Sequence, residues 1–201
     1  MTTAFTTVNL KELIQGRRTC YQFADLKDFP VSNQTLYECL EAARWAPNHK
    51  LTQPWRFWIV GEQAKEKMAH IYADNRALRK AQREDEQYQI LYEKAFEKFN
   101  SIPKIVLVGQ VLNDNPIIQK EDYAACACAI QNFQLMAWSL QVGVQWSTGP
   151  IISDARTYDY LSIVPGNIEL IGALYLGHLK EDCQNSNSKR EPLEYFITHL
   201  D

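Results

Sequence analysis

The sequence lacks the short patterns that assign a nucleotide, a metal or a compartment directly. No GxGxxG or GxxxxGK[ST] motif occurs in its 201 residues, so the usual loops for a bound dinucleotide or nucleotide triphosphate are missing. No basic region followed by an apolar segment opens the chain, so no secretory signal is expected. If the protein uses NAD(P)H, we expect it to bind transiently as a co-substrate. The expected location is cytoplasmic.

The cysteines are few and scattered, without a CxxC pair or a histidine at metal-ligand spacing. Cys126 and Cys128 would point roughly 200° apart around a helix, which does not suit joint ligation of one metal. We therefore expect reduced thiols that serve as small core residues, and we expect no metal site. The five positions are Cys20, Cys39, Cys126, Cys128 and Cys183.

Charge of one sign is also missing, because 24 acidic and 21 basic residues leave a net charge of -3. No global positive field is available for nucleic acid or for an anionic membrane, so neither partner is expected. The basic stretch from Arg76 to Arg83 runs directly into Glu84–Glu86, which indicates a solvated helix face. The most apolar helix, over residues 123–142, carries five Gln, Asn and Ser side chains and is expected to be buried in protein rather than in a membrane.

The chain length and its pattern of elements predict one domain, residues 1–201, of the α+β class. Strands separated by helices indicate a three-layer α/β/α sandwich, while the Pro- and Gly-free stretch 63–100, read as one helix or two in succession, departs from a regular βαβ series. Helices are predicted at 8–16, at 33 up to Pro47 with Ser32 as N-cap, at 63–100 and at 123–142. Strands are predicted at 55–60, 104–111, 144–146 and 168–178.

Three segments carry chemically useful residues in a fixed order. They are Arg17-Arg18-Thr19 after the first helix, the run APNHKLTQPW at 46–55, and GVQWSTGP at 143–150. Together they resemble the nitroreductase family of FMN-dependent proteins over nearly the whole chain, and the APNHK and VQWSTG variants are most similar to its small YdjA-like branch. The resemblance implies a mixed, mainly antiparallel central sheet and an intertwined homodimer with FMN sites at the subunit interface.

The Arg17-Arg18-Thr19 segment suits an anion, because two guanidinium groups beside a hydroxyl give charge-assisted hydrogen bonds to a phosphate. The alternative is that the arginines complement the helix dipole and face water. The resemblance also implies that a basic segment near the C-terminus closes on the phosphate, with Arg190 as the corresponding residue. A charged surface tail is the plainer interpretation of that segment.

The second segment is stiffened by prolines and offers polar groups for a ribityl chain or a pyrimidine edge. The family resemblance implies that Trp45 and His49 contact FMN from the opposite subunit, although a lone loop histidine is more often a surface residue. The cofactor-binding residues predicted here are Trp45, Pro47, Asn48, His49 and Gln53.

The third segment is implied by the resemblance to place backbone N–H groups of Thr148 and Gly149 near flavin N5, with Trp146 and Ser147 also at the cofactor. Trp146 taken alone is more typical of a packing residue. Two positions depart from the family pattern: Leu51, where many relatives have Asn, and Ser147, where the close branch often has Arg. Either change could weaken FMN binding.

No side-chain acid or base is required, because the flavin performs the chemistry. The leading hypothesis is a ping-pong reductase that passes a hydride from NAD(P)H through FMN to a small oxidised acceptor such as a nitroaromatic or a quinone. The altered Leu51 and Ser147 motivate an alternative, a non-catalytic flavin-binding or interaction protein. A third hypothesis is a specialised flavin reaction with residues 79–86 as a lid.

Overall fold

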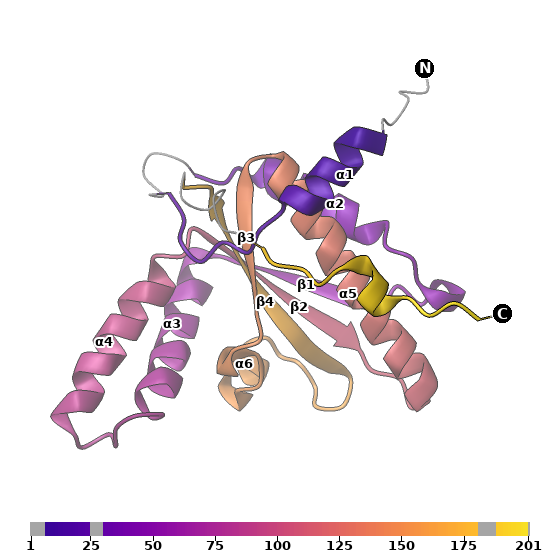
Figure 1. Cartoon of the computed structure of the whole chain (residues 1–201). Helices are drawn as coiled ribbons and strands as arrows, with labels where there is room; N and C mark the ends of the chain where they lie inside the picture. Colours follow the sequence, from indigo (N-terminus) through magenta and orange to yellow (C-terminus); the bar gives the residue numbers. More distant parts are fainter. Residues whose placement is uncertain (1–6, 25–29, 181–187, 201) are drawn as a thin grey trace.

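The computed structural model describes residues 7–24, 30–180 and 188–200. Its centre is a four-stranded sheet in the order β1-β2-β4-β3, with helices on both faces (Figure 1). The strands are β1 (Trp55–Val60), β2 (Lys104–Val111), β3 (Val142–Ser147) and β4 (Ile168–His178). The helices are α1 (Thr7–Gly16), α2 (Asn33–Arg44), α3 (Glu62–Ala77), α4 (Glu86–Asn100), α5 (Pro116–Ser139) and α6 (Ala155–Tyr160). The predicted α+β class is confirmed.

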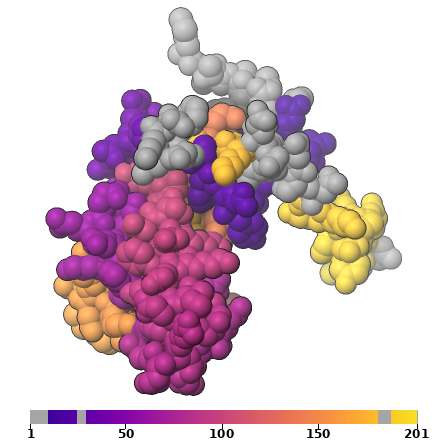
Figure 2. Space-filling model, turned by 90° about the vertical axis from the view of Figure 1, so that its left-hand side faces the viewer, coloured from indigo at the N-terminus to yellow at the C-terminus, as the bar shows by residue number. Residues whose placement is uncertain are grey.

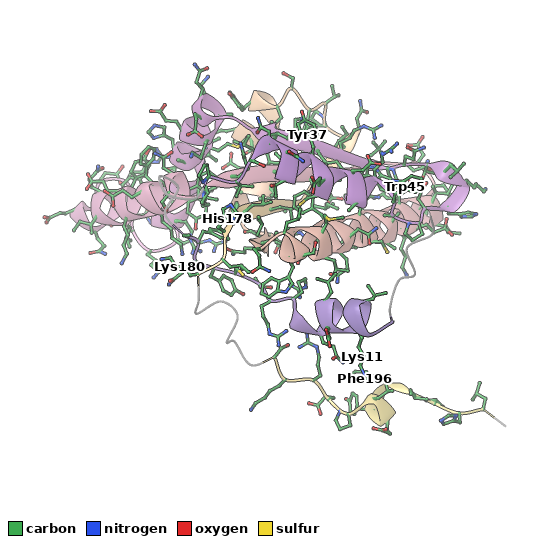
Figure 3. The ribbon with its side chains drawn as sticks, turned by 90° about the horizontal axis from the view of Figure 1, so that it is seen from above. Lys11, Tyr37, Trp45, His178, Lys180 and Phe196 are labelled. Carbon is green, nitrogen blue, oxygen red and sulfur yellow. The ribbon has the colours of Figure 1, made fainter. Side chains whose placement is uncertain are left out.

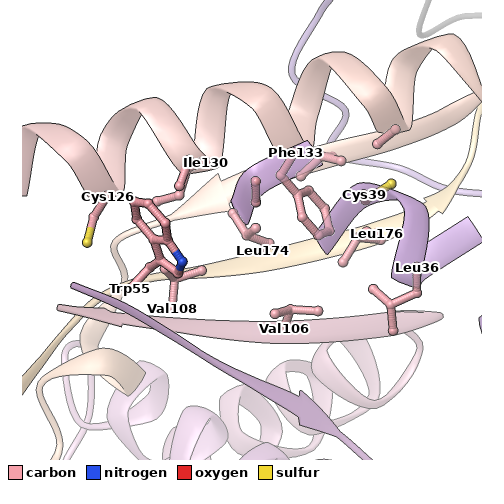
Figure 4. Close-up of a cluster of buried hydrophobic side chains, with 14 of the residues drawn as sticks. Leu36, Cys39, Trp55, Val106, Val108, Cys126, Ile130, Phe133, Leu174 and Leu176 are labelled. Carbon is pink, nitrogen blue, oxygen red and sulfur yellow. The ribbon is translucent and has the colours of Figure 1, made fainter. Parts of the chain in front are cut away.

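One face of the sheet is covered by α2 and α5, which bury a core against β2 and β4 (Figure 4). Ser32 caps α2 as predicted, because its hydroxyl accepts a hydrogen bond from the Thr35 N–H at 3.0 Å. Phe133 and Ile130 of α5 are fully buried there. Cys39 and Cys126 belong to this core, and burial raises the pKa of both thiols to about 12, so they remain protonated at neutral pH.

The other face is covered by α3, with α4 packed against it and α6 beside it. The predicted stretch 63–100 is therefore two helices in succession, joined by residues 78–85. The core on this side includes Phe99 and Tyr175, whose rings meet edge to face with centroids 5.8 Å apart. Figure 2 shows the hairpin of α3 and α4 standing out from the body.

The segment that follows α1 runs along the free edge of β3. Thr19 forms a parallel bridge with Val144, and the Cys20 N–H donates to the Val144 carbonyl at 3.2 Å. All strand pairs among β1 to β4 are antiparallel, so this bridge is the one parallel pairing within the described residues. Residues 17–24 are thereby fixed beside the strand that leads to the predicted flavin turn.

Several predicted details are wrong. Helix α5 begins at Pro116 rather than at residue 123, because Asn115 caps it and Pro116 occupies its first turn. It ends before Val142, which belongs to β3. Cys128 is exposed rather than a core residue, and Cys20 is disulfide-bonded rather than reduced. Cys183 lies outside the described residues. No helix in the described ranges has the length and apolarity that a membrane span needs.

Candidate functional site

Three arginines from the two ends of the chain share one electrostatic environment. Arg17 is half-buried, and one of its Nη atoms donates to Gln134 Oε1 of α5 at 3.3 Å. Burial lowers the pKa of Arg17, and the charges of Arg18 and Arg190 lower it further. A cation whose pKa is depressed by two like charges gains most from a bound anion. The predicted phosphate residues Arg17, Arg18 and Arg190 are therefore brought together.

The predicted flavin turn lies on the same edge of the sheet as these arginines. Thr19 pairs with Val144, and Thr148 follows four residues later along the same chain direction, about 13 Å away at roughly 3.3 Å per residue. The segments 17–19 and 146–149 thus lie near opposite ends of a stretch of β3. An extended molecule with an anion at one end can contact both.

A cleft of about 950 Å³ opens beside this edge. Its walls come from the segment after α1, from the ends of α3 and α4, and from the β3 turn. The lining residues are Tyr21, Gln22, Phe23, Ala24, Tyr72, Arg76, Arg79, Lys98, Phe99, Asn100, Ser101, Ile102, Gln145, Trp146, Ser147, Thr148, Gly149, Pro150, Tyr175 and Lys180. The third predicted segment therefore faces a space large enough for a planar ring system.

The wall of the cleft next to the turn carries an unsatisfied hydroxyl. Tyr175 is 95% buried in β4, and within the described part of the chain its hydroxyl has no hydrogen-bond partner. Burial raises the pKa of Tyr175 to about 12, against a smaller opposing effect of the Ser147 hydroxyl. Tyr175 therefore stays protonated and able to donate. The Gly149 N–H points to Ser147 Oγ at 3.4 Å, a long contact that a better acceptor can replace.

Trp146 serves the scaffold of the site. Its Nε1–H donates to the Ile171 carbonyl at 3.2 Å, and the indole lies over Gly172, where a Cβ atom would come within 2.2 Å of it. The ring also packs against the core beneath α5. The packing interpretation of Trp146 is therefore the one that its contacts support, and the ring fixes the strand that ends in the turn.

The loop between α2 and β1 is braced by its own polar side chains. Asn48 Oδ1 accepts from the Gln53 N–H at 3.0 Å, and Asn48 Nδ2 donates to the Ala46 carbonyl at 3.2 Å. His49 Nδ1 lies 2.7 Å from Glu121 Oε2 at the start of α5. Asn48 thus holds the loop rather than projecting from it, while Trp45, Pro47 and His49 are exposed.

This loop also contains strained backbone. Lys50, Leu51 and Gln53 have φ values of 52°, 55° and 44°, in the left-handed region that side chains other than glycine disfavour. Each such residue costs about 1 kcal/mol or more, and strain of this kind concentrates at ligand sites. Leu51 is 76% exposed, so no packing within the described chain offsets the cost at that residue.

The loop and the arginines lie on opposite edges of the sheet. The loop leads into β1, whereas residues 17–19 and 146–149 follow β3, and the order β1-β2-β4-β3 separates the two edges by roughly 14 Å. Figure 3 shows Trp45 well apart from Lys180, which lines the cleft, on the other side of the view. One chain therefore does not bring the second predicted segment to the other two.

Two groups of residues were missed by the sequence analysis. The first is the cleft wall formed by Tyr175 and the cations of the α3–α4 hairpin. The second is a network around the buried Asp74, which accepts hydrogen bonds from Tyr88, Arg83 and Arg156 at 2.7–2.8 Å. Burial alone would raise the pKa of Asp74, but those donors lower it. In sequence, the basic stretch 76–83 is followed directly by acidic residues, and this pattern does not distinguish the arginines that line the cleft from the one that binds Asp74.

The fold described above is a nitroreductase fold. Residues 14–178 match the family model described as "Nitroreductase family", so the chain belongs to it. It is 30% identical over 154 residues, 74% of each chain, to "Putative NAD(P)H nitroreductase YfhC" of Bacillus subtilis. It is 23% identical to "Putative NAD(P)H nitroreductase YdjA" of Escherichia coli, over 94% of this chain and 98% of the relative.

Solved structures agree in fold. A nitroreductase-like family protein from Bacillus cereus superposes with a TM-score of 0.82 at 24% identity and covers 100% of both chains. A nitroreductase with bound FMN from Bacteroides fragilis gives a TM-score of 0.66 at 23% identity, covering 96% of this chain and 98% of its own. These structures confirm the predicted α+β fold.

Proposed function

We propose that this protein is an FMN-dependent oxidoreductase that transfers a hydride from NAD(P)H to a small oxidised acceptor, such as a nitroaromatic or a quinone, in the cytoplasm. The observation that carries the proposal is the grouping of Arg17 with Arg18 and Arg190, on the same strand edge as the turn 146–149. The relatives named as NAD(P)H nitroreductases and the FMN-bound structure of the same fold support it.

The residues present fit FMN. Arg17, Arg18 and Arg190 would hold its phosphate, with Thr19 beside them, because a phosphate dianion neutralises clustered guanidinium groups. The N–H groups of Thr148 and Gly149 would face the redox-active nitrogen of the ring. The cleft offers room for the flavin and for a second molecule stacked on it.

When bound, FMN would supply the two-electron chemistry. In the net reaction NAD(P)H is oxidised to NAD(P)⁺, and its hydride together with one proton reduces a quinone to a hydroquinone, or a nitro group to a nitroso group and water. The chain contributes binding and orientation. Its cations stabilise negative charge in the cleft, backbone donors of the turn orient the reacting ring, and Tyr175 supplies a neutral hydrogen-bond donor. No described side chain is required as a general acid or base.

Reconstitution under argon tests the proposal. The protein is mixed with excess FMN, freed of unbound cofactor, and treated with NADH or NADPH while the visible flavin absorbance is followed. A reductase binds FMN and loses its yellow colour rapidly, and a nitroaromatic restores it. Protein that retains FMN but is not bleached is instead a flavin-binding module, and protein that retains no FMN overturns the proposal.

We further propose that two chains form a homodimer with the FMN sites at the subunit interface. The site of one chain is incomplete, because Trp45, Pro47, His49 and Gln53 lie at the edge away from the arginine cluster. Exposed apolar side chains are available for such an interface: Trp45 is 74% exposed and Tyr37 63%. The C-terminal segment projects from the body with Tyr195 77% and Phe196 67% exposed (Figure 2).

Mixing two damaged subunits tests the shared site. An Arg17→Gln chain and a Trp45→Ala/His49→Ala chain each form homodimers with two damaged sites. A heterodimer contains one wild-type site and one with both defects, so mixed samples should recover up to half of the wild-type FMN capacity per heterodimer. If both segments serve the same site within one chain, mixing restores nothing. Light scattering reports whether dimers form at all, and a strictly monomeric protein overturns the proposal.

A further inference from the structure

Among the described residues, the cleft beside β3 is lined by four cationic side chains and by no carboxylate. Arg76 belongs to the last turn of α3, Arg79 follows that helix, Lys98 is near the end of α4, and Lys180 comes just after β4. The whole chain carries more acidic than basic residues, 24 against 21, so this lining does not reflect composition. Positive charge is concentrated at the cleft.

None of these four cations forms an ion pair with another described residue. Arg83, from the same stretch of sequence, is instead bound to Asp74 at 2.7 Å. The Arg76 guanidinium lies 5.6 Å from the ring centre of Tyr72, another cleft residue, and this contact holds it at the wall. Unpaired charge of one sign around a concavity attracts the opposite sign.

The hydroxyl of Tyr175 is a second, independent observation at the same cleft. It is buried, and apart from a weak interaction with the Ser147 hydroxyl it has no hydrogen-bond partner among the described residues. A buried donor that lacks a partner costs stability, so its persistence indicates a group that binds there. A donor in that position suits an oxygen atom of a ligand seated between the turn and the hairpin.

We propose that the electron acceptor of this protein carries an anionic group, a carboxylate or a phosphate, which binds Arg76 and Arg79 while the reducible group faces Thr148 and Gly149. Tyr175 donates a hydrogen bond to an acceptor oxygen. The inference rests on the proposed function, because it adds the charge class of the acceptor to that reaction. Electrons still come from NAD(P)H through the flavin, so the stoichiometry given above is unchanged.

A matched pair of probes tests the charge class, namely 4-nitrobenzoate and its neutral methyl ester. Their affinities for the oxidised FMN-loaded protein are measured by calorimetry without NAD(P)H, so no turnover is needed. We expect the carboxylate to bind the wild type about tenfold more tightly than the ester, and the Arg76→Gln/Arg79→Gln variant to lose that preference. Lys94→Gln removes an exposed cation of α4 outside the cleft and should retain it.

The result that overturns the inference is equal affinity of the two probes for the wild type, or a preference that survives in the double variant. Added salt should reduce the preference, because exposed charges are screened. If the double variant does not fold, Lys98→Gln offers a second measurement, with an expected two- to threefold loss for the carboxylate alone. No change in Lys98→Gln then counts against the inference.

The hydride donor is a second possible ligand of these cations, because NADPH carries one phosphate more than NADH. Anaerobic flavin reduction by NADH and by NADPH separates the two sources of negative charge. The double variant should change both rates by less than about twofold, and a selective loss with NADPH reassigns the cations to the donor and overturns the inference. A variant that fails to bind FMN or to be bleached instead counts against the proposed function, so the two failures are distinguishable.

Discussion

Arg17→Gln is the substitution that tests the anion site most directly. Arg17 is half-buried, is bonded to Gln134 at 3.3 Å, and lies close enough to Arg18 and Arg190 for both charges to lower its pKa. Glutamine retains a hydrogen-bonding amide while removing the charge. The substitution therefore isolates the electrostatic attraction between this guanidinium and a phosphate.

The expected effect is large for FMN and small for riboflavin. A hydrogen bond to a charged group contributes about 1.5–3 kcal/mol, which corresponds to roughly a ten- to hundredfold loss of FMN affinity. Riboflavin lacks the phosphate, so its affinity should change less than about threefold. The cofactor-free protein should lose less than about 1 kcal/mol of stability, because the lost bond to Gln134 is offset by relief of repulsion from two like charges.

Flavin fluorescence quenching measures both affinities, and denaturant unfolding measures the stability. Lys94→Gln removes one positive charge from an exposed position on α4 and serves as the control for net charge. Equal losses for FMN and riboflavin would show that Arg17 supports the fold of the site rather than the phosphate. An unchanged FMN affinity would remove the physical basis for placing an anion at residues 17–19.

Three further predictions concern the scaffold. Gly172→Ala should cost about 2–4 kcal/mol in denaturant unfolding, because its Cβ would overlap the Trp146 indole; a loss below 1 kcal/mol contradicts that packing. Hydrogen bonds from Arg156 lower the pKa of Asp154 to about 2. The ionised carboxylate therefore contributes about 1 kcal/mol, after solvent screening, to the free energy of unfolding above about pH 4, and this contribution is lost as the pH falls towards about 2. Asp154→Asn should therefore flatten that part of the stability profile, and an unchanged slope refutes the assignment. The Cys126 thiol should resist iodoacetamide in the folded protein at neutral pH, as mass spectrometry of the alkylated chain can check.

Local signals predicted most of the fold. The strands at 55–60, 104–111 and 168–178 have the predicted limits, because each is a short apolar run that ends at a turn or at polar residues. The break between α3 and α4 falls in the polar segment 78–85, where no glycine or proline marks it. Only the packing of one helix on the other, with Tyr88 meeting Asp74 at 2.7 Å, defines that turn.

Other elements depend on context that a single pass along the chain does not provide. The signal at Asn115-Pro116, an N-cap followed by proline in the first turn, was present but lay outside the apolar periodicity that defined residues 123–142. Helix α6 is six residues long and too short for a periodic pattern. Asp154 caps it and draws it to α3 through Asn75 at 2.8 Å, a contact between residues distant in sequence.

The arginines show why the order of charged residues along the sequence does not by itself locate a binding site. Arg17 and Arg18 were predicted as an anion cradle because adjacent guanidinium groups are conspicuous in sequence, whereas Arg190, at the other end of the chain, was named only through the family resemblance; its charge acts on Arg17 in the structure. Arg76 and Arg79 were interpreted as a solvated face because acidic residues follow them, and both are indeed exposed. In space, however, Arg83 of the connection between α3 and α4 binds Asp74, whereas Arg76 and Arg79 remain at the cleft. Opposite charges that are neighbours in sequence therefore do not neutralise one another in space, and the cleft retains a positive wall that composition alone conceals.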